Sequence, residues 1–523
     1  MAPRSPVEEI LAGIWAEVLG LDKVSIRDNF FDLGGHSLLA IKVLEKAARK
    51  NLHIMPRQLF QTPTVFDLAK SVGKESANYN NNLSIGATEL LPLQSRFFDR
   101  NLPNSDEFVV YSLLESQLKL NSSYLETAIN FLVNHHDALR SRFKYVNSKW
   151  TQTIVQEEKN STFSQYDISN VSERDLEPLL EKIAQEERSG LSLSEGPLIK
   201  LVYFSQGNNH SNLLLLLVHH LVSDALSMSI LLEDLETIYL QLLEKRSIKP
   251  PNKTTSLRSW ANRLKREYAN SKMFEEDINY WAKIPLEKIN KESLVSFSEG
   301  NGKGNEKEII TINLEKKRIL AILENSNSRR ISIPELAICA LGQTYINFTG
   351  NNKLLINLTN NGRYPLFKDT NLLRTVGFFA TIVPAYFDFG NLSSKREIYK
   401  LVKNQLQKVP QAKISFAIGR QLGISPLEKI FNKIQFTLNI NMSNNKSIDG
   451  TSIFFKSPIS LRLPYLIPRT KNIRIIISTN PFNEDYAVTF QYNGKYFEKE
   501  MIFRFAQDFV VELINFVELF SDQ

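Results

Sequence analysis

The chain has 523 residues, which is too long for one ordinary domain and predicts several core-forming units. Its 63 basic and 56 acidic residues are interspersed, so the net charge of +7 does not indicate a nucleic-acid partner. A single cysteine excludes an intrachain disulfide and fits a reducing, cytoplasmic compartment. No stretch reaches the roughly 18 apolar residues of a membrane helix, so we expect no membrane contact.

The first predicted element is an amphipathic helix that begins after Ser5, with Pro6 at its first position. Two adjacent glycines, Gly34 and Gly35, then break the chain before a second apolar-periodic helix. Ser37 is therefore expected at a helix N-terminus. A serine in that position is usually a helix cap and nothing more.

The run from Asp28 to Leu44, Asp-Asn-Phe-Phe-Asp-Leu-Gly-Gly-His-Ser-Leu-Leu-Ala-Ile-Lys-Val-Leu, resembles the phosphopantetheine attachment site of acyl and peptidyl carrier proteins. The resemblance implies a four-helix carrier domain over residues 1–74, with 4'-phosphopantetheine placed on Ser37 by a phosphopantetheinyl transferase. The positive pole of a helix N-terminus would favour the phosphodiester. Residues 75–87 are rich in asparagine and small polar residues, and they predict a flexible linker.

An uninterrupted apolar run from Leu213 to Val218 predicts a buried strand, which ends in His219 and His220. Such histidines can simply be bonded to backbone in a core. Asp224 favours a functional interpretation, because a carboxylate four residues after His220 can orient the loop that carries the imidazole. Side chains alternate along a strand, so we expect His219 to pack and His220 to react.

The segment 219–225 resembles the His-His-x-x-x-Asp-Gly signature of the condensation-domain superfamily of nonribosomal peptide synthetases. Ala225 stands where that family has glycine. If the glycine serves a special backbone conformation, Ala225 is expected to cause local strain and to narrow the space beside His220. Further segments resemble other motifs of the family, namely Leu91–Phe98, Val133–Phe143 and Arg374–Pro384.

The resemblance implies a fold class of α plus α/β: the helical carrier domain, then a two-lobed α/β domain over residues 88–523 that is similar to chloramphenicol acetyltransferase. The N-lobe is expected over about 88–255 and the C-lobe over about 256–523, with the active site between them. His220 would be the catalytic residue. Asp224 is expected to pair with Arg363 at the lobe interface, and we expect no metal site in the chain.

The second motif contains a rival cluster, His135-His136-Asp137. Its flanking pattern is helical, and Arg140 and Arg142 follow it closely. We therefore expect a structural ion-pair corner there rather than a catalytic site.

Several stretches are more similar to epimerization domains than to ordinary condensation domains, namely residues 135–140, 231–235, 251–256 and 409–419. In that branch a glutamate in Glu-Gly-His-Gly-Arg partners the histidine. At the matching positions, 359 to 363, this chain reads Thr-Asn-Asn-Gly-Arg, so the carboxylate is absent. Thr359 cannot act as a general base without an activating neighbour. It is expected to support the site together with Asn361, leaving His220 as the one acid/base group.

Three functions stay open from the sequence. The domain could condense a carrier-bound donor with a nucleophile, it could epimerize the tethered residue with an unusual second acid/base group, or it could be a silent platform that recruits another enzyme. Because the chain contains no adenylation domain, it resembles an excised piece of a larger synthetase. The expected partners are an upstream adenylation domain, other synthetase modules and a tethered aminoacyl or peptidyl substrate.

Overall fold

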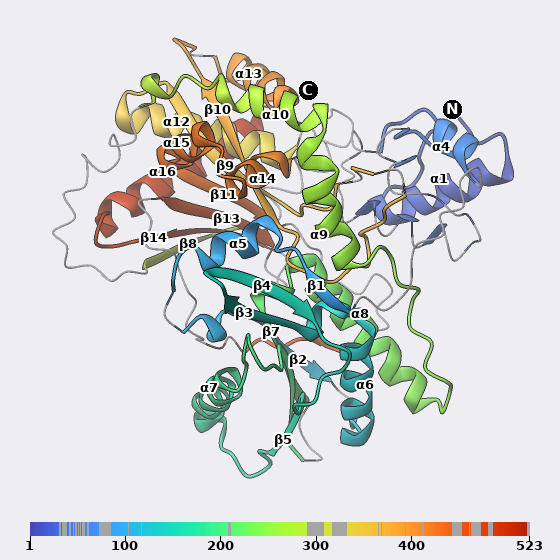
Figure 1. The fold of residues 1–523 in the computed structure, drawn as a ribbon. Coiled ribbons are helices and arrows are strands. Elements are labelled where there is room, and N and C mark those ends of the chain that lie inside the picture. The colour runs from blue at the N-terminus through green and yellow to red at the C-terminus, as the bar shows by residue number, and fades with distance from the viewer. Residues whose placement is uncertain are drawn as a thin grey trace.

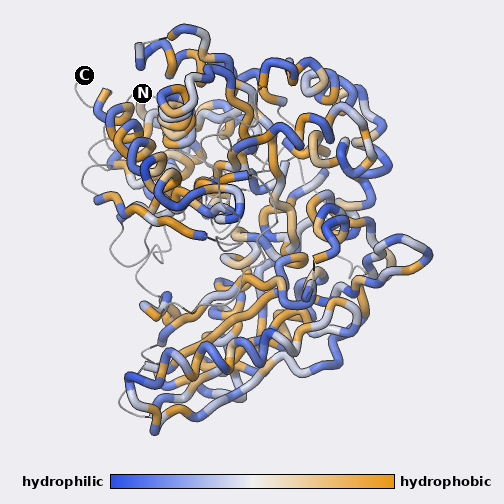
Figure 2. The backbone as a smooth tube through the Cα atoms, turned by 90° about the vertical axis from the view of Figure 1, so that its left-hand side faces the viewer, coloured by the Kyte–Doolittle hydropathy of each residue, from blue (hydrophilic) through white to orange (hydrophobic). Residues whose placement is uncertain are grey.

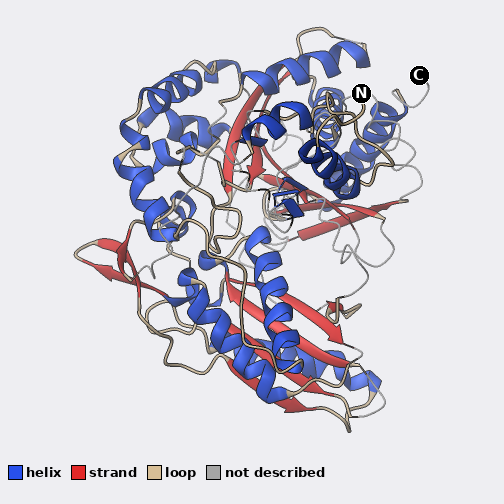
Figure 3. Ribbon diagram, turned by 90° about the vertical axis from the view of Figure 1, so that its right-hand side faces the viewer, coloured by secondary structure: helices blue, strands red, loops and turns tan. Residues whose placement is uncertain are grey.

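The computed structural model of the chain shows a small helical region followed by two lobes, each built on its own sheet (Figure 1, Figure 3). Ser37 and residues 75–84 of the predicted linker lie outside the described residues. The structure describes residues 1–30, 33, 39–40, 43–44, 46–47, 50, 52, 54, 58–59, 62–72, 85–102, 104–116, 118–207, 211–289, 308–315, 332–364, 366–367, 369–392, 394–410, 413–441, 452–459, 461, 472–479 and 485–519.

The carrier region contains the helices α1 (Pro6–Leu19) and α4 (Val65–Ser71). As predicted, α1 begins at a serine cap: the Ser5 hydroxyl accepts a hydrogen bond from a backbone N–H of the first turn at 3.2 Å. Trp15 and Phe30 meet edge to face in a compact apolar core that both helices share. The region therefore packs as a helical unit with its own core.

The N-lobe is organised around a five-stranded sheet in the order β12-β2-β7-β6-β5. Its central strand β7 is the predicted buried strand, with α6 and α8 on one face and α7 on the other, which explains an apolar run without alternation. Hydrophobic stretches follow the strands of this lobe in Figure 2. The elements are β2 (Val109–Ser116), α6 (Ser122–His135), β5 (Phe163–Asp167), α7 (Glu173–Ser189), β6 (Ile199–Ser205), β7 (Asn212–His219), α8 (Ala225–Leu243) and β12 (Phe455–Lys456).

The C-lobe is organised around a six-stranded sheet in the order β10-β9-β11-β13-β14-β8. Helices α12, α13 and α16 cover one face of this sheet with a large apolar core. The elements are β8 (Glu308–Leu314), α12 (Ile333–Thr349), β9 (Lys353–Asn360), β10 (Thr381–Asp388), α13 (Lys395–Lys408), β11 (Phe436–Asn441), β13 (Ile473–Thr479), β14 (Tyr486–Tyr492) and α16 (Lys499–Glu518).

Short helices and a small sheet complete the two lobes. The small sheet has the order β1-β4-β3. Helix α5 contacts α14, so it bridges the two lobes near their junction. The elements are β1 (Gly86–Thr88), α5 (Pro92–Phe98), β3 (Ser141–Val146), β4 (Lys149–Ile154), α9 (Leu257–Arg266), α10 (Lys272–Ala282), α14 (Ser415–Gln421) and α15 (Ser425–Lys433).

Two segments from the range expected for the C-lobe, 256–523, contribute to the N-lobe. β12, from the second half of the chain, pairs with β2 of the N-lobe sheet, and α9 packs into the N-lobe core. Gly86 and Ala87, which the sequence placed in the linker, pair with β4 as part of β1. These contacts are backbone pairings and long-range packing, which leave little local signal in the side-chain pattern.

Gly362, just after β9, has a left-handed backbone with φ of +68°, and a Cβ there would lie 1.7 Å from the Phe379 carbonyl oxygen. Gly350 has φ of +70° with nothing within 4 Å of such a Cβ. We predict that Gly350→Ala lowers the free energy of unfolding by about 1 kcal/mol and that Gly362→Ala lowers it by more than about 4 kcal/mol. Urea denaturation checks this, and equal losses would contradict the close approach.

Candidate active site

His220 lies at the junction of the two lobes, in a single 3-10 turn (His220–Val222) that joins β7 to α8. Its ring stacks on Phe108 at a centroid distance of 4.9 Å and packs against Phe378 at 4.7 Å. Phe108 immediately precedes β2 of the N-lobe, whereas Phe378 belongs to the segment between β9 and β10 of the C-lobe. The imidazole is partly buried between aromatic rings that come from both lobes.

The proton of the neutral His220 ring is placed by the backbone. Nδ1 lies 2.7 Å from the Ser223 carbonyl oxygen, which can only accept a hydrogen bond. Nδ1 is therefore the donor, and Nε2 carries the lone pair. Burial lowers the pKa of His220 below its usual value, although the Ser223 carbonyl and the charge of Asp224 act in the opposite direction. The geometry thus presents Nε2 as a proton acceptor at neutral pH.

His219 is fully buried at the end of β7. Its Nε2 donates to the Ser105 carbonyl oxygen at 2.9 Å, and its Nδ1 accepts the Leu221 N–H at 3.2 Å. Burial lowers the pKa of His219 to about 4. With both ring nitrogens engaged, this side chain packs and has no nitrogen left for a substrate.

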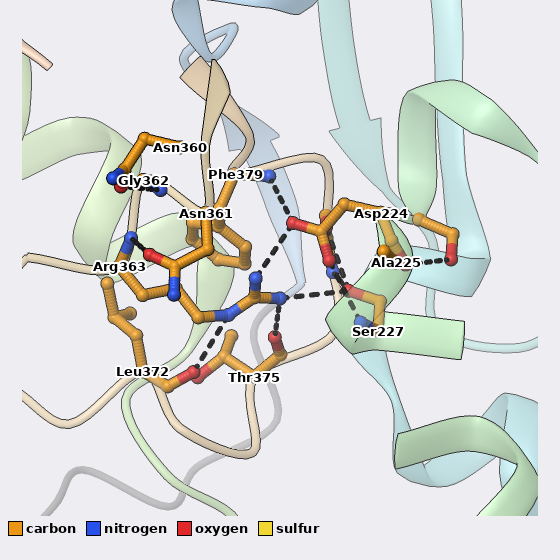
Figure 4. Close-up of polar contacts among 12 residues, drawn as sticks. Asp224, Ala225, Ser227, Asn360, Asn361, Gly362, Arg363, Leu372, Thr375 and Phe379 are labelled. Atoms are coloured by element: carbon orange, nitrogen blue, oxygen red, sulfur yellow. Dashed lines mark hydrogen bonds and ion pairs between the residues drawn. The ribbon is translucent and has the colours of Figure 1, made fainter. Parts of the chain in front are cut away.

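Asp224 and Arg363 form the predicted pair across the lobe interface (Figure 4). The Asp224 Oδ2 atom accepts hydrogen bonds from Arg363 Nη1 at 2.8 Å and from the Phe379 N–H at 3.1 Å. Its Oδ1 atom caps α8 by accepting the Ser227 N–H at 2.9 Å. Both oxygens are used in these contacts, so Asp224 serves the architecture around His220.

Arg363 fixes the segment that carries Phe378. Its Nε donates to the Leu372 carbonyl at 3.2 Å, and its Nη2 donates to the Ser227 hydroxyl at 2.9 Å and the Thr375 carbonyl at 3.0 Å. The side chain is almost fully buried, with 1% of its surface exposed. A buried cation with this many acceptors holds a single geometry.

Ala225 does not cause the expected strain. It is the first residue of α8, and among the described residues the non-glycine positions with positive φ do not include it. A helical backbone is open to any L-residue, so the change from glycine has no conformational cost here. The side chain is exposed.

Thr359 lies near the end of β9, and its hydroxyl is 2.8 Å from Asn439 Oδ1 on the neighbouring strand β11. The described partners of this hydroxyl include no carboxylate and no imidazole. Asn361 accepts the Arg363 N–H at 3.2 Å through its side-chain oxygen, so it shapes the turn after β9. Neither residue has a neighbour that would turn it into a general base.

The structure adds two residues to the site that the sequence did not mark, Phe108 and Ser223. Phe108 meets His220 only through the pairing of β2 with β7, and no local pattern marks it. Ser223 contributes its backbone carbonyl, so its side-chain identity carries no signal. Phe378 lies within the Arg374–Pro384 motif, but its contact with His220 could not be predicted from the sequence.

The rival cluster is the predicted ion-pair corner. His136 Nε2 lies 2.9 Å from Asp234 Oδ2, and Arg140 Nη2 donates to Asp137 at 3.1 Å. These residues lie on α6, α8 and the turn after α6, away from His220.

The condensation domain family matches residues 85–523, and the chain therefore belongs to this family. Residues 9–72 match the phosphopantetheine attachment site family, so a carrier domain with covalently attached 4'-phosphopantetheine precedes the condensation-superfamily domain. The chain is a carrier and condensation-superfamily didomain of a nonribosomal peptide synthetase. Among the helices that the structure describes, none is both long and apolar enough to span a bilayer.

The chain is 29% identical to gramicidin S synthase 1 from Brevibacillus brevis over 99% of its length, and it spans 48% of that relative. A linear gramicidin synthase of Brevibacillus parabrevis is 32% identical over 99% of the chain, which spans 10% of that relative. The chain thus covers less than half the length of these relatives.

The epimerization domain from the third module of tyrocidine synthetase B superposes with a TM-score of 0.73 at 22% identity, covering 85% of this chain and 99% of that domain. The first condensation domain of the CDA synthetase superposes with a TM-score of 0.64 at 18% identity, covering 83% and 97%. These structural likenesses establish the fold and do not separate the two activities.

Replacing Asp224 with asparagine keeps an oxygen for the α8 cap and removes the charge that faces Arg363. We predict that Asp224→Asn lowers the free energy of unfolding by about 3 kcal/mol, because it leaves a buried guanidinium without its counter-charge. The exposed pair of Arg263 and Glu267 is the matched control, where Glu267→Gln is expected to cost less than about 1 kcal/mol. Similar losses in both variants, measured by urea denaturation, would show that the buried pair does not hold the lobes.

Proposed function

We propose that the large domain forms an amide or related bond by assisting attack of a nucleophile on a thioester carried by the upstream carrier domain. The observation that carries the proposal is the asymmetry of the site. His220 presents a lone pair at Nε2, whereas the Thr359 hydroxyl is engaged with an amide side chain. One acid/base group is sufficient for condensation, which also needs the reactants held in line.

The carrier domain presents the acyl group as a thioester on phosphopantetheine, and we propose Ser37 as its attachment residue. Ser37 is outside the described residues, but Leu39 and Ala40, which follow it, are helical. This supports an attachment point next to a helix N-terminus, where the backbone favours a phosphodiester. A phosphopantetheinyl transferase, an upstream adenylation domain and other synthetase modules are the proposed partners.

His220 would accept the proton that an attacking amine loses. The Ser223 carbonyl keeps the proton of the neutral ring on Nδ1, and the same bond stabilises the imidazolium that forms after transfer. Asp224 adds a nearby negative charge that also favours the imidazolium. Phe108 and Phe378 hold the ring plane between them, so that Nε2 keeps one direction.

Epimerization of the tethered residue is the second candidate, and the fold likeness to an epimerization domain favours it. Removal and return of an α-proton on opposite faces requires two groups or one mobile group. His220 is held on three sides by Phe108, Phe378 and the Ser223 carbonyl, which argues against a mobile group. Thr359 lacks an activating neighbour among the described residues, which argues against a second one.

We also propose a cytoplasmic location. The one cysteine, Cys339, is a buried free thiol, and burial raises its pKa. A protein that keeps a free thiol and no disulfide fits a reducing compartment.

We predict that His220→Gln slows product formation by about 10² to 10⁴-fold, as expected for loss of an acid/base group. Thr359→Val, the matched control, should change the rate less than about threefold, because the Thr359 hydroxyl takes no part in proton transfer. The assay presents a carrier-loaded acyl group to free amines and to loaded acceptor carriers. An unchanged rate in His220→Gln would exclude His220 as the acid/base group, and a large loss in Thr359→Val would indicate a second one. A wild-type rate no faster than the reaction without the domain would indicate a silent platform.

The same assay has an expected pH dependence. The base form of His220 is neutral, and burial holds its pKa below 6.5. The rate divided by the free-base fraction of the amine should therefore stay level down to about pH 7 and fall at lower pH as Nε2 becomes protonated. A fall of this corrected rate that begins above pH 7 would show that the reactive group is not this buried histidine.

A further inference from the structure

A second group of histidines lies apart from His220, at the end of α6. One ring nitrogen of His135, one of His136 and a carboxylate oxygen of Asp234 all lie within 4.8 Å of one another. His135 and His136 end α6, whereas Asp234 comes from the middle of α8. No metal motif marks this group in the sequence, because Asp234 is 98 residues from His136.

These three side chains line a surface hollow that is open to solvent, together with Lys253 and Arg374. His136 and Asp234 are buried at its base, and His135 is partly exposed at its side.

The donor atoms of His135 and Asp234 are available to a metal ion. No hydrogen bond joins the His135 ring to another described residue, so a ring nitrogen is available as a ligand. Arg374 binds Asp234 Oδ1, which leaves Oδ2 directed at His136.

The charges around the hollow balance among the described residues. Arg374 pairs with Asp234 and with Glu233, for which Nη1 lies 3.1 Å from the carboxylate. Asp137 accepts from both Arg140 and Lys253, at 3.1 and 3.2 Å. Three carboxylates are therefore paired with three cations. Before an ion binds, the described charges around the hollow have no net positive sum that would repel a divalent ion.

We propose that His135, His136 and Asp234 form a binding site for a first-row divalent metal ion, with Zn²⁺ as the preferred ion. Two imidazole nitrogens and one carboxylate oxygen suit Zn²⁺ rather than Mg²⁺ or Ca²⁺, and water completes the coordination. Small side-chain rotations would adjust the present donor spacing to the bonds of about 2.0 to 2.2 Å that Zn²⁺ makes. His136 then carries its proton on Nδ1, and the ion replaces its hydrogen bond to Asp234.

Such an ion would fasten the lobe junction without entering the catalytic site. It would join α6 to α8 directly, and through Arg374 it would hold the segment between β9 and β10. Asp234 is ten residues along α8 from Asp224, a distance of about 15 Å at 1.5 Å per residue. The site therefore adds a structural clamp that is separate from the proposed chemistry at His220.

The test uses the full chain without a histidine tag, stripped of metal with a chelator. Zn²⁺ is titrated by calorimetry, and Co²⁺ is followed by visible absorption, which reports imidazole coordination directly. We expect one ion per chain with a Kd in the micromolar range or below, and a higher unfolding temperature with Zn²⁺. His135→Ala is the main variant, because His135 ends its helix and makes no described hydrogen bond. It should weaken binding at least tenfold and abolish the rise in unfolding temperature.

His220→Gln is the matched control, since it removes a histidine outside this group, and it should bind Zn²⁺ as the wild type does. Asp234→Asn provides a second variant that should also weaken binding. The proposal is overturned if Zn²⁺ shows no saturable binding, if His135→Ala binds with unchanged affinity, or if His220→Gln loses the site instead.

Discussion

The buried pair of Asp224 and Arg363 joins the two lobes where the chemistry would occur. Asp224 caps α8 of the N-lobe, and Arg363 binds the backbone of the segment that leads to β10. This one contact sets the end of β7 against Phe378 and so fixes the aromatic wall of His220. A charge pair with 5% and 1% exposure needs hydrogen-bond partners for its buried polar atoms, and both Asp224 oxygens and all three guanidinium nitrogens of Arg363 have them.

Among the described residues, His220 is the group that we propose to move a proton. His220 obtains its tautomer from a backbone carbonyl and its lowered pKa from burial, which outweighs the opposing charge of Asp224. The neighbouring strands supply Thr359 and Asn439, which bond to each other. This arrangement supports the proposed bond formation, although the fold is shared with an epimerization domain. The shared fold and the proposed activity are compatible, because a fold does not fix the chemistry of its site.

The sequence could predict features that depend on local pattern. The apolar run of β7 and the serine cap of α1 follow from period and capping chemistry, and the structure has both. The opposite directions expected for His219 and His220 stay a prediction, because His220 lies in the turn after β7. The contact of Phe108 with His220 and the joining of β12 to β2 could not be predicted, because they arise from pairing between distant segments. The pairing of Asp224 with Arg363 came from family resemblance, since 139 residues separate them. The concern about Ala225 was wrong, because position 225 has an ordinary helical backbone.

The most direct measurement of the proposed chemistry follows the α-carbon of a carrier-bound aminoacyl group in heavy water by mass spectrometry. A site with one acid/base group should form the amide product with an added amine while the α-position gains no deuterium. Deuterium gain at that carbon that disappears in His220→Ala would contradict condensation as the main activity, because it would require the domain to remove and return the α-proton.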